Sequence, residues 1–229
     1  MELRVIILAG GSGSRWGNYR GVPKHLVEIE GEVLLARTVK QFLKHTSDVW
    51  VVGPDDRYKF DGANLYTPEI DDSPKEMSKF ISSHDLWLDK KNSKNILVFG
   101  DVYFTDDAVR TIVSDKDEWK FFLRRNGSII TGKPHKEIFA ISFSSSMSVT
   151  FSHKIFMLYV SVSEILSAGG WHLFKDMTLG NARSRQELFK NGGFVEINDW
   201  TEDFDYPKDL DNWESRKTTL WSEDYSTSY

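Results

Sequence analysis

A glycine-rich segment lies directly after the first apolar stretch of the sequence, and two basic residues follow it. The segment reads Leu8-Ala9-Gly10-Gly11-Ser12-Gly13-Ser14, and the basic residues are Arg15 and Lys24. Glycines allow backbone N–H groups to turn toward a phosphate chain and to approach it closely, which bulkier residues would prevent sterically. The two cations can then neutralise the phosphate charge. This pattern predicts that residues 8–14, the glycine-rich loop, bind a phosphate-bearing ligand.

Two other phosphate-binding patterns fit this segment poorly. A Walker loop requires Gly-Lys followed by Ser or Thr, which is absent here, and the dinucleotide fingerprint requires a small residue where Trp16 stands. An ordinary turn between a strand and a helix stays open as an alternative. So many glycines with two cations after them are more typical of a binding loop.

An acidic residue follows a later apolar stretch, which ends in Gly100-Asp101. Ligands of open α/β sheets bind beyond the carboxyl ends of the strands, and Mg²⁺ prefers hard oxygen ligands beside phosphate oxygens. Asp101 is therefore a candidate metal ligand. An Asp in this place often caps a helix instead, but Thr105, Asp106 or Asp107 can cap the next helix and leave that carboxylate free.

These residues need secondary-structure elements that hold them at one edge of a sheet. Short runs rich in Val and Ile, each followed by turn residues, predict buried strands at 3–8, 48–53 and 95–100. Apolar residues at helical spacing predict helices within 33–43 and 77–88. Parallel strands that alternate with helices form a sheet covered on both faces. We therefore expect an α/β fold, with a mostly parallel sheet flanked by helices.

The second half of the sequence predicts an antiparallel addition to this sheet. Residues 119–125 and 128–131 flank Asn126-Gly127, a strong hairpin signal. The other predicted elements are a strand at 137–143, a helix within 150–167, a strand at 193–197 and a final helix that begins near Pro207. We expect residues 1–216 to form a single domain and the polar segment 217–229 to be a partly disordered tail.

Composition excludes several classes of protein. The 229 residues contain no cysteine, so disulfides, thiolate zinc sites and cysteine nucleophiles are ruled out. A net charge of −5 at pH 7 offers no general attraction to nucleic acid. No apolar run approaches the roughly 20 residues of a membrane span, and residues 1–4 lack the features of a secretory signal. We therefore expect a cytoplasmic protein whose partners are small molecules, with neither nucleic acid nor a membrane among them.

The glycine-rich loop, Arg15 and the pair Pro23-Lys24 together resemble the signature loop of the sugar-phosphate nucleotidyltransferase superfamily, which includes MobA-like and cytidylyltransferase-like members. The resemblance implies a Rossmann-like α/β domain whose loop wraps an NTP. It implies that Arg15 and Lys24 are the catalytic residues that contact the NTP phosphates. It also implies that Asp101 holds Mg²⁺ as the cofactor.

The segment Glu202–Leu210 is similar to the Asp-x-Pro-x-Asp-Leu segment that opens the last helix in this superfamily. The resemblance implies that Asp205 supplies a second ligand to Mg²⁺. Asp203 is the alternative ligand, because the stretch between strand and helix is longer here than is usual in the superfamily. Asp205 could instead cap the helix, with Pro207 in its first turn.

The resemblance leaves the base and the acceptor less well defined. Residues 67–78 lack the glycine-rich form with which the superfamily reads the base, so we take Ser78 as the base contact, with Ser73 as an alternative that can also cap a helix. Lys133 and Arg124 lie in the antiparallel region that would cover the acceptor, and we take them as contacts to its phosphate.

The implied reaction is the Mg-dependent transfer of NMP from an NTP to a phosphorylated sugar or another small phosphorylated acceptor, with release of pyrophosphate. CTP is preferred because the chain is compact, while UTP and GTP stay open, as do a monomer and a homodimer. One alternative is a nucleotide-sugar-dependent glycosyltransferase, although the expected Asp-x-Asp motif is absent from Gly100-Asp101-Val102-Tyr103. The other is a catalytically silent nucleotide-binding subunit.

Overall fold

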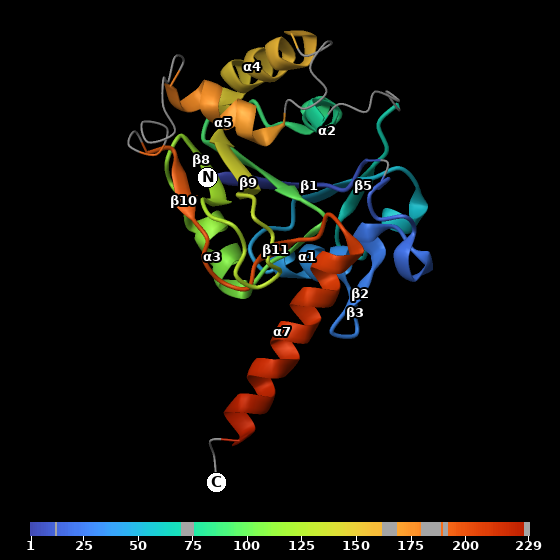
Figure 1. The fold of residues 1–229 in the computed structure, drawn as a ribbon. Helices are drawn as coiled ribbons and strands as arrows, with labels where there is room; N and C mark the ends of the chain where they lie inside the picture. Colours follow the sequence, from blue (N-terminus) through green and yellow to red (C-terminus); the bar gives the residue numbers. More distant parts are fainter. Residues whose placement is uncertain (12, 70–75, 162–168, 180–188, 190–191, 227–229) are drawn as a thin grey trace.

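A seven-stranded sheet forms the centre of the computed structural model (Figure 1), which describes residues 1–229 except 12, 70–75, 162–168, 180–188, 190–191 and 227–229. In sheet order the strands are β10 (Phe194–Glu196), β8 (Trp119–Arg124), β9 (Glu137–Ser144), β6 (Ser93–Phe99), β1 (Glu2–Leu8), β4 (Val49–Val52) and β5 (Asn64–Tyr66). Strands β6, β1, β4 and β5 run parallel, whereas β9 runs antiparallel to both β6 and β8. The mostly parallel sheet with an antiparallel addition is therefore confirmed.

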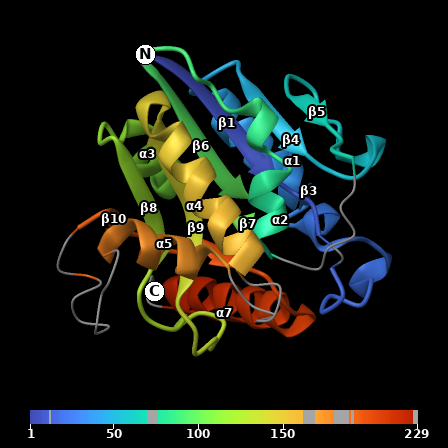
Figure 2. The same cartoon turned by 90° about the horizontal axis from the view of Figure 1, so that it is seen from above.

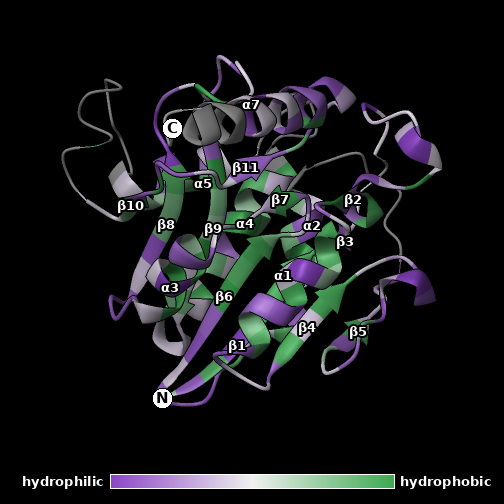
Figure 3. Ribbon diagram, turned by 90° about the horizontal axis from the view of Figure 1, so that it is seen from below, coloured by the Kyte–Doolittle hydropathy of each residue, from purple (hydrophilic) through white to green (hydrophobic). Residues whose placement is uncertain are grey.

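Helices cover both faces of this sheet (Figure 2). Helices α1 (Leu34–Leu43) and α3 (Asp106–Ser114) pack on one face, and α2 (Glu76–Ile81), α4 (Ser148–Ser161) and α5 (Gly170–Leu179) pack on the other. Successive residues of β1 alternate between the two cores, with Ile7 facing α1 and α3 and with Ile6 and Leu8 facing the other helices. Burial on both faces explains why the central strands are apolar over most of their length (Figure 3).

Shorter elements lie outside the main sheet. Two ribbons of two antiparallel strands each are formed by β2 (Glu28–Ile29) with β3 (Glu32–Val33) and by β7 (Val102–Tyr103) with β11 (Glu202–Asp203). Short 3-10 helices cover Tyr19–Gly21, Lys24–Leu26, Asp56–Tyr58, His84–Leu86 and Ser145–Met147. The helix expected within 77–88 is therefore split between α2 and a 3-10 turn.

The last helix, α7 (Pro207–Ser226), begins where the sequence predicts and projects away from the sheet (Figure 1). Its first turns pack into a third apolar cluster, in which Leu210 and Trp213 meet Trp16 and Leu34. The segment expected as a polar tail from residue 217 onward is helical as far as Ser226.

The hairpin predicted around Asn126-Gly127 is wrong in its second strand, because β8 pairs with β9 and residues 128–131 form a loop. The Ser128 hydroxyl accepts hydrogen bonds from the N–H groups of Ile130 and Thr131, each at 3.1 Å. Such local side-chain bonding competes with a strand ladder.

Among the described residues, no helix combines the length and the apolarity that a membrane span requires.

Candidate active site

The glycine-rich loop and Asp101 leave the sheet side by side, because β1 and β6 are parallel neighbours with Leu8 opposite Phe99. The Gly100 N–H donates to the Leu8 carbonyl at 2.9 Å. A Cβ atom on Gly100 would lie 3.0 Å from the Ala9 Cβ and 3.1 Å from the Leu8 oxygen, so a larger residue would push the two segments apart. Glycine at this position therefore holds Asp101 close to the loop.

Within the loop, Leu8 and Ala9 are buried at the end of β1, whereas Gly11 and Ser14 are exposed. Gly11 and Gly13 have φ of +133° and +56°, a region that glycine adopts without strain. Gly10, which precedes them, is half-buried, and Ser12 lies outside the described residues. The described part of the loop thus offers exposed backbone at the carboxyl edge of the sheet, and its contact with a nucleotide stays a prediction.

Lys24 is nearly buried and forms an ion pair with Asp101. Its ammonium also lies 3.9 Å from a carboxylate oxygen of Asp205. Burial by itself lowers the pKa of the Lys24 ammonium, but the attraction of Asp101 and then of Asp203 outweighs this effect and raises the pKa above its usual value. Lys24 is therefore cationic throughout the range in which proteins function.

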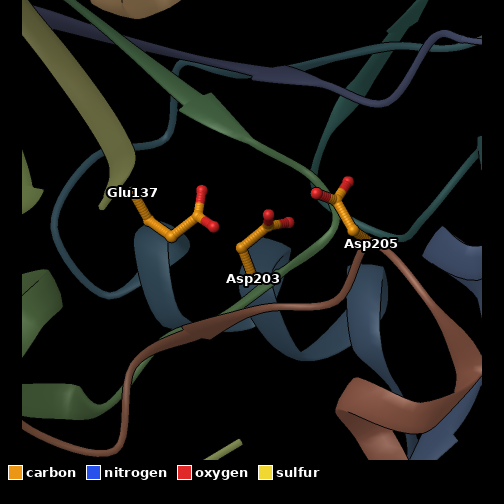
Figure 4. A group of neighbouring side chains, drawn as sticks. All are labelled: Glu137, Asp203 and Asp205. Carbon is orange, nitrogen blue, oxygen red and sulfur yellow. The ribbon is translucent and has the colours of Figure 1, made fainter. Parts of the chain in front are cut away.

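Three further carboxylates gather beside this ion pair (Figure 4). Glu137 comes from the start of β9, Asp203 from the end of β11, and Asp205 from the loop before α7. One oxygen of each lies within 4.8 Å of the others, so these three residues, the carboxylate cluster, could share one metal ion. Asp203 was the alternative metal ligand from the sequence, whereas Glu137 was not anticipated.

The charges in the carboxylate cluster are crowded. Burial and then the repulsion of Asp101 raise the pKa of Asp203 well above its usual value. Burial likewise raises the pKa of Glu137 to about 7, although Lys133 opposes the shift. Crowded carboxylate oxygens are hard ligands that suit a divalent cation such as Mg²⁺, whose charge would relieve their repulsion. The residues present therefore fit the cofactor that the sequence predicts.

Asp205 does not cap the last helix. Asp209, in the first turn of α7, reaches back instead, and its Oδ2 accepts from the N–H groups of Asp205 and Tyr206, which precede the helix, at 3.0 and 2.9 Å. The Asp205 carboxylate contacts Arg15, with oxygen-to-nitrogen distances of 3.1 and 3.2 Å. Arg15 is also 5.5 Å above the ring of Tyr206 and remains largely exposed. Arg15 and Asp205, two predicted site residues far apart in sequence, therefore form an ion pair.

Asp101 is likewise free of a capping role, because Thr105 caps helix α3. The Thr105 hydroxyl accepts from the Ala108 N–H at 3.0 Å and donates to Asp199. The helix that follows β6 thus has its own cap, and the carboxylate of Asp101 is available to the site.

Thr105→Ala should lower the free energy of unfolding by about 1 to 2 kcal/mol, because the first turn of α3 loses its side-chain acceptor. Urea unfolding followed by circular dichroism measures the change. Thr111→Ala is the matched control, since among the described residues that hydroxyl donates only to a carbonyl of its own helix and alanine favours the helix interior. Equal losses in the two variants would contradict the capping role.

The two predicted acceptor contacts lie in different surroundings. The Lys133 ammonium is inside the carboxylate cluster, 3.0 Å from Glu137 and 3.2 Å from Asp203. Arg124 is buried in an ion pair with Glu202 at 2.6 Å and donates to the Thr201 carbonyl. The structure thus gives Arg124 a structural pairing, and the acceptor role of Lys133 stays a prediction.

Ser78 lies on helix α2 and is half-buried. Its contact with a base stays a prediction, and Ser73 lies outside the described residues.

Glu137 could have been found from topology, because the amino end of an antiparallel strand lies at the same edge as the carboxyl ends of its parallel neighbours.

A parallel sheet with a glycine-rich loop after its first strand, and with cations and carboxylates at the same edge, is the architecture of a nucleotide-binding α/β protein. Residues 5–128 match the model of the MobA-like NTP transferase domain. The chain belongs to this family.

Solved structures with the same fold include two enzymes. The first is a CTP:phosphocholine cytidylyltransferase from Streptococcus pneumoniae, which is 14% identical with a TM-score of 0.63, over 94% of this chain and 99% of the other. The second is an inositol-1-phosphate CTP transferase from T. maritima, which is 13% identical with a TM-score of 0.60, over 95% of this chain and 96% of the other. No curated protein matched the sequence.

Proposed function

We propose that the protein transfers the nucleotidyl group of an NTP, with CTP preferred, to a small phosphorylated acceptor and releases pyrophosphate. The convergence of the glycine-rich loop, Lys24 and the carboxylates at one sheet edge carries this proposal, in a chain that belongs to the MobA-like NTP transferase family. The preference for CTP is supported by the names of two structurally similar enzymes, which specify that nucleotide.

In the proposed reaction an oxygen of the acceptor phosphate forms a bond to the α-phosphorus of the NTP, and the bond from that phosphorus to pyrophosphate breaks. The acceptor oxygen is already anionic near neutral pH, so the protein need not remove a proton. Catalysis then consists of alignment and of charge neutralisation. Lys24, Arg15 and the loop N–H groups would supply both.

The proposed cofactor is Mg²⁺. Asp205, with Asp203 and Glu137 beside it, would hold the ion, and Asp101 lies next to them through its contact with Lys24. When bound, the ion supplies positive charge to the phosphate oxygens. Lys24 and Asp101 would keep their mutual orientation because both are nearly buried.

A substrate screen tests this function. Each of the four NTPs is combined with a panel of phosphorylated alcohols and sugar phosphates in the presence of Mg²⁺, and pyrophosphate release is measured. We expect CTP with one acceptor class to give the highest rate. Turnover of nucleotide sugars without pyrophosphate release would instead indicate a glycosyltransferase, and NTP binding with no turnover of any pair would indicate a binding subunit.

A further inference from the structure

Lys79 reaches the glycine-rich loop from helix α2. A Cβ atom built on Gly11 would lie 3.3 Å from the Lys79 Cε and 3.8 Å from its Nζ. The end of the lysine side chain therefore lies next to the loop backbone at Gly11, which has a φ of +133°. The sequence pattern singled out the neighbouring residue, Ser78, and gave no role to Lys79.

The Lys79 ammonium also lies close enough to Asp101 to affect its charge. Burial by itself raises the pKa of Asp101, but Lys24 and then Lys79 outweigh this effect and lower it. Lys79 thus approaches the same carboxylate that Lys24 contacts, and the exposed loop backbone lies beside both cations.

The three lysines of the site differ in how their charges are satisfied. Lys24 is paired with Asp101, and Lys133 with Glu137 and Asp203. Within the part of the chain that the structure describes, Lys79 has no carboxylate within 4.0 Å of its ammonium and no hydrogen-bond acceptor. A half-buried lysine whose ammonium lies beside the loop backbone, and is unpaired among the described residues, is suited to bind an anion.

We propose that Lys79 is a third cation for the phosphate chain of the NTP, supplied by helix α2 across the glycine-rich loop. The proposal rests on the proposed function, since it assigns a further contact to the same substrate. Among the described residues the Lys79 ammonium has no partner to give up when it contacts a phosphate oxygen, whereas Lys24 must share its charge with Asp101. Lys79 would therefore contribute to triphosphate affinity in particular.

Binding of inorganic tripolyphosphate and of CTP, measured by calorimetry at a fixed Mg²⁺ concentration, tests this role. Tripolyphosphate carries no base or ribose, so it reports on phosphate contacts alone. We expect Lys79→Met to weaken both ligands by roughly 10-fold or more, the scale of one charge-assisted hydrogen bond, and Lys79→Arg to weaken them by less than about 3-fold. Lys91→Met is the matched control, because Lys91 is exposed before the opposite end of β6 and should leave both affinities unchanged.

Tripolyphosphate binding by Lys79→Met at wild-type affinity would overturn the proposal, as would equal losses in Lys79→Met and Lys91→Met. The thermal midpoint of each variant shows whether a loss arises from misfolding, and Lys79→Gln, which also removes the charge, preserves the test if methionine is not tolerated. Wild-type protein that binds both ligands but releases no pyrophosphate with any acceptor would refute the proposed function while leaving the Lys79 contact intact. Full turnover by Lys79→Met with unchanged KM for CTP would refute the Lys79 contact alone.

Discussion

Lys24→Met should reduce the rate of pyrophosphate release by about 10²–10³-fold, the usual cost of removing one preorganised group that stabilises transition-state charge. The substitution keeps the apolar stem and removes only the ammonium, which contacts Asp101 and approaches Asp205. The cation therefore lies where the phosphate charge is expected to develop. Lys91→Met, which removes an equal charge far from the loop, should leave the rate unchanged.

The same substitution should also affect stability. Because Lys24 and Asp101 are both nearly buried, removing one partner leaves an unpaired buried charge, and we expect the free energy of unfolding to fall by about 3 kcal/mol. Urea unfolding measures this loss. The double variant with Asp101→Asn should recover part of the stability but none of the turnover. Wild-type turnover in Lys24→Met would refute the assignment of this lysine to the site.

Asp205→Asn and Asp203→Asn should each lower turnover by on the order of 10²-fold or more, because each removes a ligand and a charge from the proposed metal site. Asp101→Asn should have a similar effect through its contact with Lys24. The double variant Asp203→Asn with Asp205→Asn should lose little more than the worse single variant, since residues that act as a unit are not additive.

Pyrophosphate release measured against Mg²⁺ concentration distinguishes metal ligands from other residues. A ligand variant should require a higher concentration of the ion, whereas Asp211→Asn, which changes an exposed carboxylate on helix α7, should behave like wild type. If Asp205→Asn keeps a near-normal rate while Asp203→Asn does not, Asp203 is the ligand and the alignment of the last motif is wrong. Normal Mg²⁺ dependence in every variant would exclude this site.

The parallel half of the fold follows directly from the sequence. The runs at 3–8, 48–53 and 95–100 lie on strands β1, β4 and β6, because strands buried on both faces must be apolar at nearly every position. The glycine-rich loop and Asp101 could be placed at one edge of the sheet because the carboxyl ends of parallel strands lie at the same edge. Local patterns were sufficient wherever each residue's role depends on its neighbours in the chain.

The rest of the site depends on contacts between distant segments. Glu137 joins the carboxylate cluster only because β9 runs antiparallel beside β6, and strand order is not encoded in the local pattern. Arg124 pairs with Glu202, which lies far away in sequence on the ribbon strand β11, and its expected contact with the acceptor stays a prediction. Lys79 was overlooked because nothing in the sequence brings helix α2 over Gly11.

The packing of Trp16 against Leu210 and Trp213 has a consequence for the order in which the molecule is made. Trp16 follows the glycine-rich loop and is synthesised well before its partners on α7, which lie far later in the chain. Domains generally fold as units, so an early segment must wait for late partners. The loop therefore reaches its final packing only after α7 has been synthesised, and a nascent chain stalled before Pro207 should lack a formed site.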